Sequence, residues 1–144
     1  MPAATNRRVF LLAAAAVLLA APAMAQTQDE ITAAQSAIAG QMEAFLADDG
    51  AAAYSYAAPN IRRLFPTVDG FMGMVDSGYQ PVRRPSSYAF GKSIPLGTGD
   101  FLQEVLITGP DGKGWRALYR MQLQPDGSWK IAGVSLKSAD LPSA

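Results

Sequence analysis

The sequence predicts an α+β domain, because helical patterns occupy its first half and strand patterns its second half. Between residues 27 and 78, apolar side chains recur at intervals of three and four residues, which is the spacing of one helix face. From residue 87 onward, apolar and polar residues alternate in four runs separated by turns rich in Gly and Pro. We therefore expect a long helix and several short helices, followed by a four-stranded antiparallel sheet.

The first 25 residues have the three parts of a signal peptide. Arg7 and Arg8 form the basic region, Val9–Ala21 is an apolar run of 13 residues, and Ala23-Met24-Ala25 is a small-x-small cleavage site. A membrane-spanning helix needs about 20 residues, so an uncleaved anchor fits less well. We expect cleavage after Ala25, which leaves residues 26–144 as a single domain in the periplasm or outside the cell.

The export route has two interpretations. Residues 6–11 read Asn-Arg-Arg-Val-Phe-Leu, which resembles the twin-arginine signal of paired arginines followed by a large apolar pair. Signals of the general secretory route also carry two basic residues, so both routes stay open.

Composition excludes several kinds of chemistry. The chain contains no cysteine and no histidine, which excludes disulfides, thiolate nucleophiles and imidazole bases, and no cofactor is expected. Removal of Arg7 and Arg8 with the leader leaves 10 of the 12 basic residues against 12 acidic ones. A slightly acidic domain is a poor partner for the phosphates of nucleic acid, and we expect no membrane association after cleavage.

Helix signals follow in order. Thr27 and Glu30 form a capping box, and Asp48-Asp49-Gly50 ends the long helix. Shorter helices are predicted over residues 51–57, over residues 60–65 after a proline, and over residues 68–78, whereas two prolines and a glycine predict an extended connector over residues 78–85. The apolar stripe of the long helix comprises Ile31, Ala34, Ile38, Met42, Phe45 and Leu46.

Four strands are predicted, over Ser87–Lys92, Phe101–Thr108, Trp115–Leu123 and Trp129–Leu136. Residues 110–114 close the second and third strands, and Pro125-Asp126-Gly127 closes the third and fourth as a three-residue loop. This register sets Gly109 opposite Trp115, Val105 opposite Tyr119, Gln103 opposite Met121, Glu104 opposite Arg120, Leu123 opposite Trp129 and Tyr119 opposite Gly133.

The strands alternate between an apolar face and a mixed face. We predict a bulge at Gly133, since otherwise Val134 and Leu136 would join the mixed face. The mixed face carries Leu102, Glu104, Leu106, Arg116, Leu118, Arg120 and Lys130. The apolar, inner face carries Phe101, Val105, Ile107, Trp115, Tyr119, Met121, Leu123, Trp129 and Ile131.

Helices followed by a sheet that ends in Pro125–Gly133 resemble the nuclear-transport-factor-2-like (cystatin-like, SnoaL-like) superfamily. Within it, the chain is similar over Ala34–Leu136 to a bacterial exported family, domain of unknown function 4864. The resemblance implies that the sheet curves around the helix into a cystatin-like cone. It brings no established catalytic residues, and the missing histidine excludes the His–Asp chemistry of some superfamily enzymes. The motifs that carry it are Leu64–Thr67, Phe71–Val75, Gly78–Val82, Arg84-Pro85 and Trp129–Gly133.

Five polar residues are candidates for ligand binding. Arg83 and Arg84 could clamp a carboxylate or phosphate, with Tyr79 nearby on the connector, or they could bind helix ends and acids instead. Gln103 and Tyr119 point toward the inner face, where Tyr119 either borders a ligand or fills the core.

We therefore expect an exported, non-catalytic domain that binds a small apolar or amphipathic molecule between its helices and its sheet. One alternative is an isomerase- or hydratase-like enzyme that uses Tyr54, Tyr119 and a carboxylate such as Asp49. That alternative is disfavoured because no aspartate lies on the predicted inner face. The other is a dimerising or partner-binding module in which the mixed face of the sheet forms a homodimer.

Overall fold

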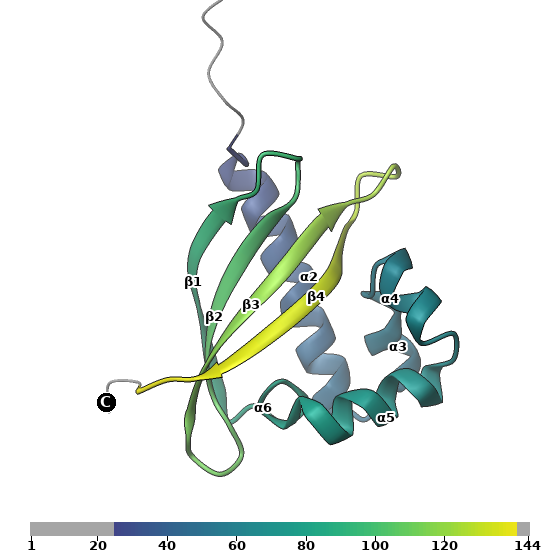
Figure 1. Cartoon of the computed structure of the whole chain (residues 1–144), viewed down its shortest axis with the longest axis vertical. Helices are drawn as coiled ribbons and strands as arrows, with labels where there is room; N and C mark the ends of the chain where they lie inside the picture. The colour runs from purple at the N-terminus through teal and green to yellow at the C-terminus, as the bar shows by residue number, and fades with distance from the viewer. Residues whose placement is uncertain (1–24, 141–144) are drawn as a thin grey trace, which may run out of the picture.

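The four strands form one antiparallel meander in the order β1-β2-β3-β4, and the long helix α2 crosses one face of it (Figure 1). The computed structural model describes residues 25–140, so the predicted leader up to Met24 and its export motif lie outside the described residues. The strands are β1 (Ser87–Pro95), β2 (Phe101–Thr108), β3 (Gly114–Leu123) and β4 (Trp129–Ser138). Helices followed by an antiparallel sheet confirm the predicted α+β class.

Helix α2 (Gln28–Leu46) begins at the predicted capping box. Thr27 Oγ1 accepts from the Glu30 amide at 3.2 Å, and Glu30 Oε1 accepts from the Thr27 amide at 3.0 Å. The predicted stripe is wrong at Leu46, which is 46% exposed, while Gln41 is buried in its place. Steps of three and four residues lead from Ile38 through Gln41 to Phe45, whereas the next residue turns about 100° away from the sheet.

Four short helices follow: α3 (Gly50–Ser55), α4 (Pro59–Leu64), α5 (Val68–Gly78) and α6 (Gln80–Arg83). Helix α3 ends two residues earlier than predicted, because the Tyr56 carbonyl and the Ala58 amide bond to the backbone of Ile131 at 2.9 and 2.8 Å. Helix α6 replaces the predicted extended connector. Its Pro81 lies in the first turn, where a missing amide hydrogen costs nothing.

The predicted β2–β3 register is wrong by two residues. Gly109 pairs with Lys113 at 2.8 Å, and Gly112 adopts a φ of 83°, so Pro110-Asp111-Gly112 is a three-residue loop. Gln103 therefore lies opposite Tyr119 and Val105 opposite Ala117, and Leu118, not Arg120, faces Glu104. Because side chains alternate with a period of two, the shift leaves every residue on its predicted face.

The bulge predicted at Gly133 is confirmed between β3 and β4. Met121 pairs with Ile131 and Arg120 with Gly133, so Ala132 is the extra residue. Tyr119 consequently lies opposite Val134 rather than Gly133. Val134 and Leu136 return to the inner face and pack against the core.

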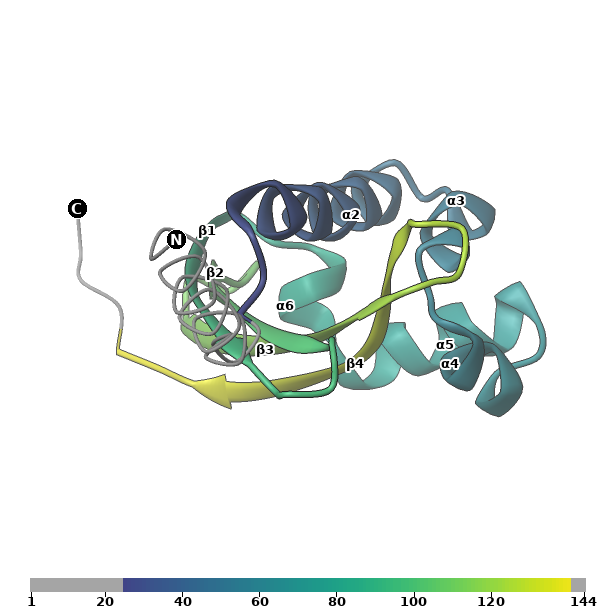
Figure 2. The same ribbon diagram turned by 90° about the horizontal axis from the view of Figure 1, so that it is seen from above.

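The core lies between α2 and the inner face of the sheet, and α3, α4 and α5 gather beyond the β4 edge (Figure 2). Leu123 departs from the predicted inner face, since it is 46% exposed at the end of β3, and Trp115 is half-buried. The largest fully buried side chains are Tyr119, Phe45, Phe101, Ile38, Met42, Ile107, Met121, Gln103 and Val105.

Candidate functional site

An apolar pocket of about 260 Å³ lies where the helices meet the inner side of β4. It draws on helices α2, α4, α5 and α6 and on the bulged part of β4, so residues far apart in the sequence share one wall. The lining residues are Gln41, Phe45, Ala57, Ile61, Leu64, Phe65, Phe71, Met74, Val75, Tyr79, Val82, Ile131, Gly133 and Val134.

Two sets of contacts shape the pocket. On the β4 side, the backbone link between Tyr56–Ala58 and Ile131 is extended by Asn60, whose Nδ2 donates to the Ala132 carbonyl at 2.9 Å. On the α5 side, the Phe71 ring stacks on Phe45 at 6.2 Å between ring centroids and tilts against Tyr54 at 5.3 Å. These contacts fix α4 against β4, and α5 against α2 and α3, on two sides of the pocket.

The pocket wall has polar side chains only at Gln41 and Tyr79, and none of the lining residues is charged. Gln41 is 4% exposed, and its Nε2 donates to the Ala53 carbonyl at 3.1 Å. Tyr79, one of the five predicted site residues, lies half-buried between α5 and α6. The wall therefore suits an apolar molecule that carries few polar groups.

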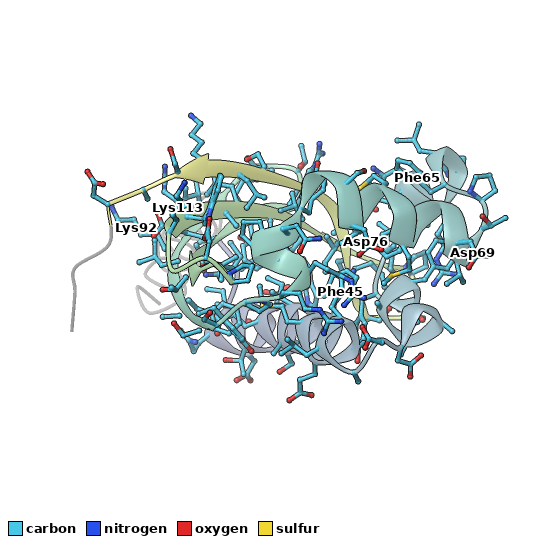
Figure 3. The ribbon with its side chains drawn as sticks, turned by 90° about the horizontal axis from the view of Figure 1, so that it is seen from below. Phe45, Phe65, Asp69, Asp76, Lys92 and Lys113 are labelled. Carbon is cyan, nitrogen blue, oxygen red and sulfur yellow. The ribbon has the colours of Figure 1, made fainter. Side chains whose placement is uncertain are left out.

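Arg83 and Arg84 lie next to the pocket but outside its lining residues. Arg83, 8% exposed, bonds to Asp48 and Asp76 at 2.8 Å each and donates to the Phe45 carbonyl. Arg84 bonds to Asp48 and donates to the Leu46 carbonyl at 3.2 Å. Phe45 and Asp76 are labelled at this junction in Figure 3. Both arginines thus hold the last carbonyls of α2, as in the alternative interpretation of the pair.

Asp48 anchors the two arginines at the end of α2. It is the one non-glycine residue among residues 25–140 with a positive φ, 56°, which suits the residue that follows a helix. The hydrogen bond from Arg83, aided by Arg84, holds the pKa of Asp48 below its usual value.

Gln103 and Tyr119 lie on the sheet and are not among the pocket-lining residues. Gln103 Nε2 donates to carbonyls of the β1 bulge, including Gly91 at 3.2 Å, and its Oε1 accepts from Ser93 at 2.7 Å and Gln35 at 3.3 Å. Tyr119 is fully buried, its hydroxyl has no hydrogen-bond partner among the described residues, and burial raises its pKa.

The residues named for the enzyme alternative do not converge. Tyr54 donates its hydroxyl to the Phe65 carbonyl at 2.6 Å, and Asp49 Oδ1 accepts from the Ala52 amide at 3.1 Å as the cap of α3. The Tyr119 hydroxyl bonds to neither of them. The described residues therefore bring no acid–base pair of these three groups into hydrogen-bond contact.

The mixed face of the sheet carries paired charges around its leucines. Glu104 pairs with Arg116, whose hydrogen bond lowers the pKa of that carboxyl, and Arg120 pairs with Asp100 at 3.0 Å. Leu102, Leu106 and Leu118 between these charges are half-buried within the single chain.

Two further kinds of site are lacking in the described part of the chain. Residues 25–140 hold no group of three or more His, Cys, Asp and Glu side chains that could bind a metal. Among the same residues, no helix has both the length and the apolar character that crossing a membrane requires.

Most of the pocket wall was not predicted from the sequence. Gln41 lies on the helix period of Ile38 and Phe45, so its polar side chain on the apolar stripe could have indicated a polar group in the pocket wall. For Ile61, Leu64 and Val134, no comparable signal exists, because their convergence depends on how α4 packs beside β4.

Comparison with known proteins identifies a protein family. The model of a protein family described as "Domain of unknown function (DUF4864)" matches residues 25–144. No curated protein and no solved structure matches the chain.

Proposed function

Because the chain belongs to the DUF4864 family, whose description assigns no activity, we propose a function from the pocket: an exported, non-catalytic module that binds a small apolar or amphipathic molecule. The observation that carries this proposal is the uncharged, largely apolar wall of the 260 Å³ pocket. Its volume corresponds to about nine water molecules at about 30 Å³ each, which suits a ligand the size of a single ring.

Export and superfamily membership belong to the same proposal. The arginine pair, apolar run and cleavage site at the N-terminus support transport to the periplasm or beyond, by either export route. The layout of a long helix across an antiparallel sheet, with short helices beyond the β4 edge, supports a place in the nuclear-transport-factor-2-like superfamily (Figure 2).

Binding rather than catalysis follows from the chemistry of the wall. A general acid or base must lie within hydrogen-bond reach of the reacting group, and the pocket wall contains no Asp, Glu, Lys or Arg. Tyr79 is the single ionisable side chain among the lining residues. The isomerase or hydratase alternative would need an acid–base pair that this wall does not supply.

Binding can be tested by filling the pocket. Val134→Phe adds bulk on the inner side of β4, and Ser135→Phe adds the same ring to the neighbouring exposed position as a matched control. By isothermal titration with toluene and p-cresol, we expect Val134→Phe to weaken binding more than about tenfold and Ser135→Phe to bind as the wild type. Urea unfolding of both variants checks that each is folded.

Failure of both probes to bind the wild type, or wild-type binding by a folded Val134→Phe, contradicts the proposal. Native mass spectrometry of the protein purified from a periplasmic extract adds a second readout, because a retained ligand appears as an adduct. The same spectrum tests the homodimer predicted through the mixed face of the sheet.

A further inference from the structure

The carboxamide of Gln41, a residue of the pocket wall, has one end bonded and one end without a partner among residues 25–140. Its Nε2 donates to the Ala53 carbonyl at 3.1 Å, and only the amide nitrogen can donate to a carbonyl, so this bond fixes the orientation of the group. Gln41 Oε1 accepts no hydrogen bond within residues 25–140, yet it is not one of the fully shielded unbonded atoms, which are Asn60 Oδ1 and the Tyr119 hydroxyl, so it keeps accessible surface. Gln41 is 96% buried, being 4% exposed, and lines the pocket.

A ligand that covers this accessible oxygen without bonding to it removes its hydration, which costs free energy. The side chains around Gln41 in the pocket are aliphatic or aromatic, except for Tyr79. A ligand that brings an O–H or N–H group to Gln41 Oε1 recovers that free energy, whereas a purely apolar ligand of equal size does not.

Charge limits the ligand further. No cationic side chain lines the pocket, and the nearby Arg83 already bonds to Asp48 and Asp76. A carboxylate or phosphate entering an apolar wall without a counter-charge would lose its hydration, and so would an ammonium group.

We propose that the pocket selects an uncharged molecule of about one ring whose hydroxyl or N–H group donates to Gln41 Oε1. Phenols and small heteroaromatic N–H compounds belong to this class. The inference rests on the proposed binding function and adds the chemical class of the ligand and the residue that selects it.

Two probes of the same shape test the selection. p-Cresol and 4-fluorotoluene differ in a hydroxyl against a fluorine, and fluorine cannot donate a hydrogen bond. By isothermal titration on the wild-type protein, we expect p-cresol to bind about fivefold more tightly, the ratio that one net hydrogen bond gives. In Gln41→Met, which keeps the length of the side chain, we expect the two affinities to become equal. Gln28→Met, the same replacement at an exposed position of α2 outside the pocket, is the control and should keep the preference. Tyr79→Phe removes the other polar group of the wall for comparison.

A second measurement needs no variant. At saturation, the Gln41 side-chain amide signal in a ¹⁵N-edited NMR spectrum should shift further with p-cresol than with 4-fluorotoluene, because a hydrogen bond to Oε1 adds to the ring-current effect that both rings produce. Equal binding of the two probes to the wild type, or an unchanged preference in Gln41→Met, overturns this inference while leaving the binding function intact. A preference lost in Tyr79→Phe instead overturns the assignment to Gln41. Failure of every probe to bind contradicts the proposed function itself.

Discussion

Two tyrosines that lie in opposite hydrogen-bonding situations should respond in opposite ways to the same substitution. Tyr119 is 0% exposed, and its hydroxyl has no partner among residues 25–140. Tyr54 donates its hydroxyl to the Phe65 carbonyl at 2.6 Å. Replacement by Phe removes one oxygen from each residue and keeps each ring in place.

The magnitudes follow from these contacts. Burial of an unbonded hydroxyl costs about 1–3 kcal/mol, so Tyr119→Phe should raise the free energy of unfolding by about 1 kcal/mol. Tyr54→Phe should lower it by about 1 kcal/mol, because it removes a hydrogen bond and leaves the Phe65 carbonyl with one partner fewer. For a domain of this size, each change corresponds to about 4 °C in the melting temperature.

Urea unfolding followed by tryptophan fluorescence measures both variants against the wild type. The two free energies of unfolding should differ by about 2 kcal/mol, with Tyr119→Phe the more stable. A loss of about 1 kcal/mol or more in Tyr119→Phe would refute the reasoning, because it would show that the Tyr119 hydroxyl contributes a hydrogen bond to the folded state.

Two further predictions concern Asp48 and the loop glycines. The pKa of Asp48 is lowered by Arg83 in the folded state, so its contribution to stability is present above about pH 4 and is lost as the pH falls through the folded value. Asp48→Asn, which tolerates the positive φ, should therefore flatten the acid side of a stability–pH curve from urea unfolding; an unchanged curve contradicts this. Gly127→Ala should lower the free energy of unfolding by about 1–2 kcal/mol, because φ is 87° there. Gly73→Ala, in the exposed interior of α5 with open space at its Cβ, should instead raise it by about 0.5–1 kcal/mol; equal effects at the two sites would refute the argument.

Local sequence signals predicted most of the secondary structure. The capping box of Thr27 and Glu30, the first-turn Pro59 and the cap at Thr67 each lie at the expected helix start. These signals are reliable because each satisfies backbone groups within a few residues of itself. The bulge near Gly133 was predictable in the same way, from the change in the apolar alternation.

The errors in the sheet have a local cause too. Residues 110–112 repeat the Pro-Asp-Gly of residues 125–127, and both loops have the glycine at positive φ, 83° and 87°. Treating the two loops alike would have given the β2–β3 register that the structure shows. Helix α6 was missed because prolines suit both an extended segment and a first helical turn.

The candidate site depends on contacts that no local signal carries. The charge of Arg83 predicts a ligand contact, but its partners are Asp76, 7 residues away on α5, and Asp48, 35 residues away, which becomes a neighbour only when α6 packs against the end of α2. Tyr79 does line the pocket, whereas Gln103 lies at the β1 bulge and outside the pocket lining. The pocket itself arises from the spacing between helices, which periodicity does not determine.

We expect helix α4 to set how quickly the pocket exchanges its contents. The helix contains no fully buried residue: its hydrogen bonds to the sheet are the Tyr56–Ala58 link to Ile131 and the bond from Asn60 to Ala132, and Ile61 packs only partly buried against the core. A segment with so little buried surface opens locally long before the sheet unfolds. The amides of α4 should therefore exchange with deuterium faster than those of β3, and a bound ligand should slow that exchange. Helix α4, which contributes Ile61 and Leu64 to the pocket wall, would then also be its entrance.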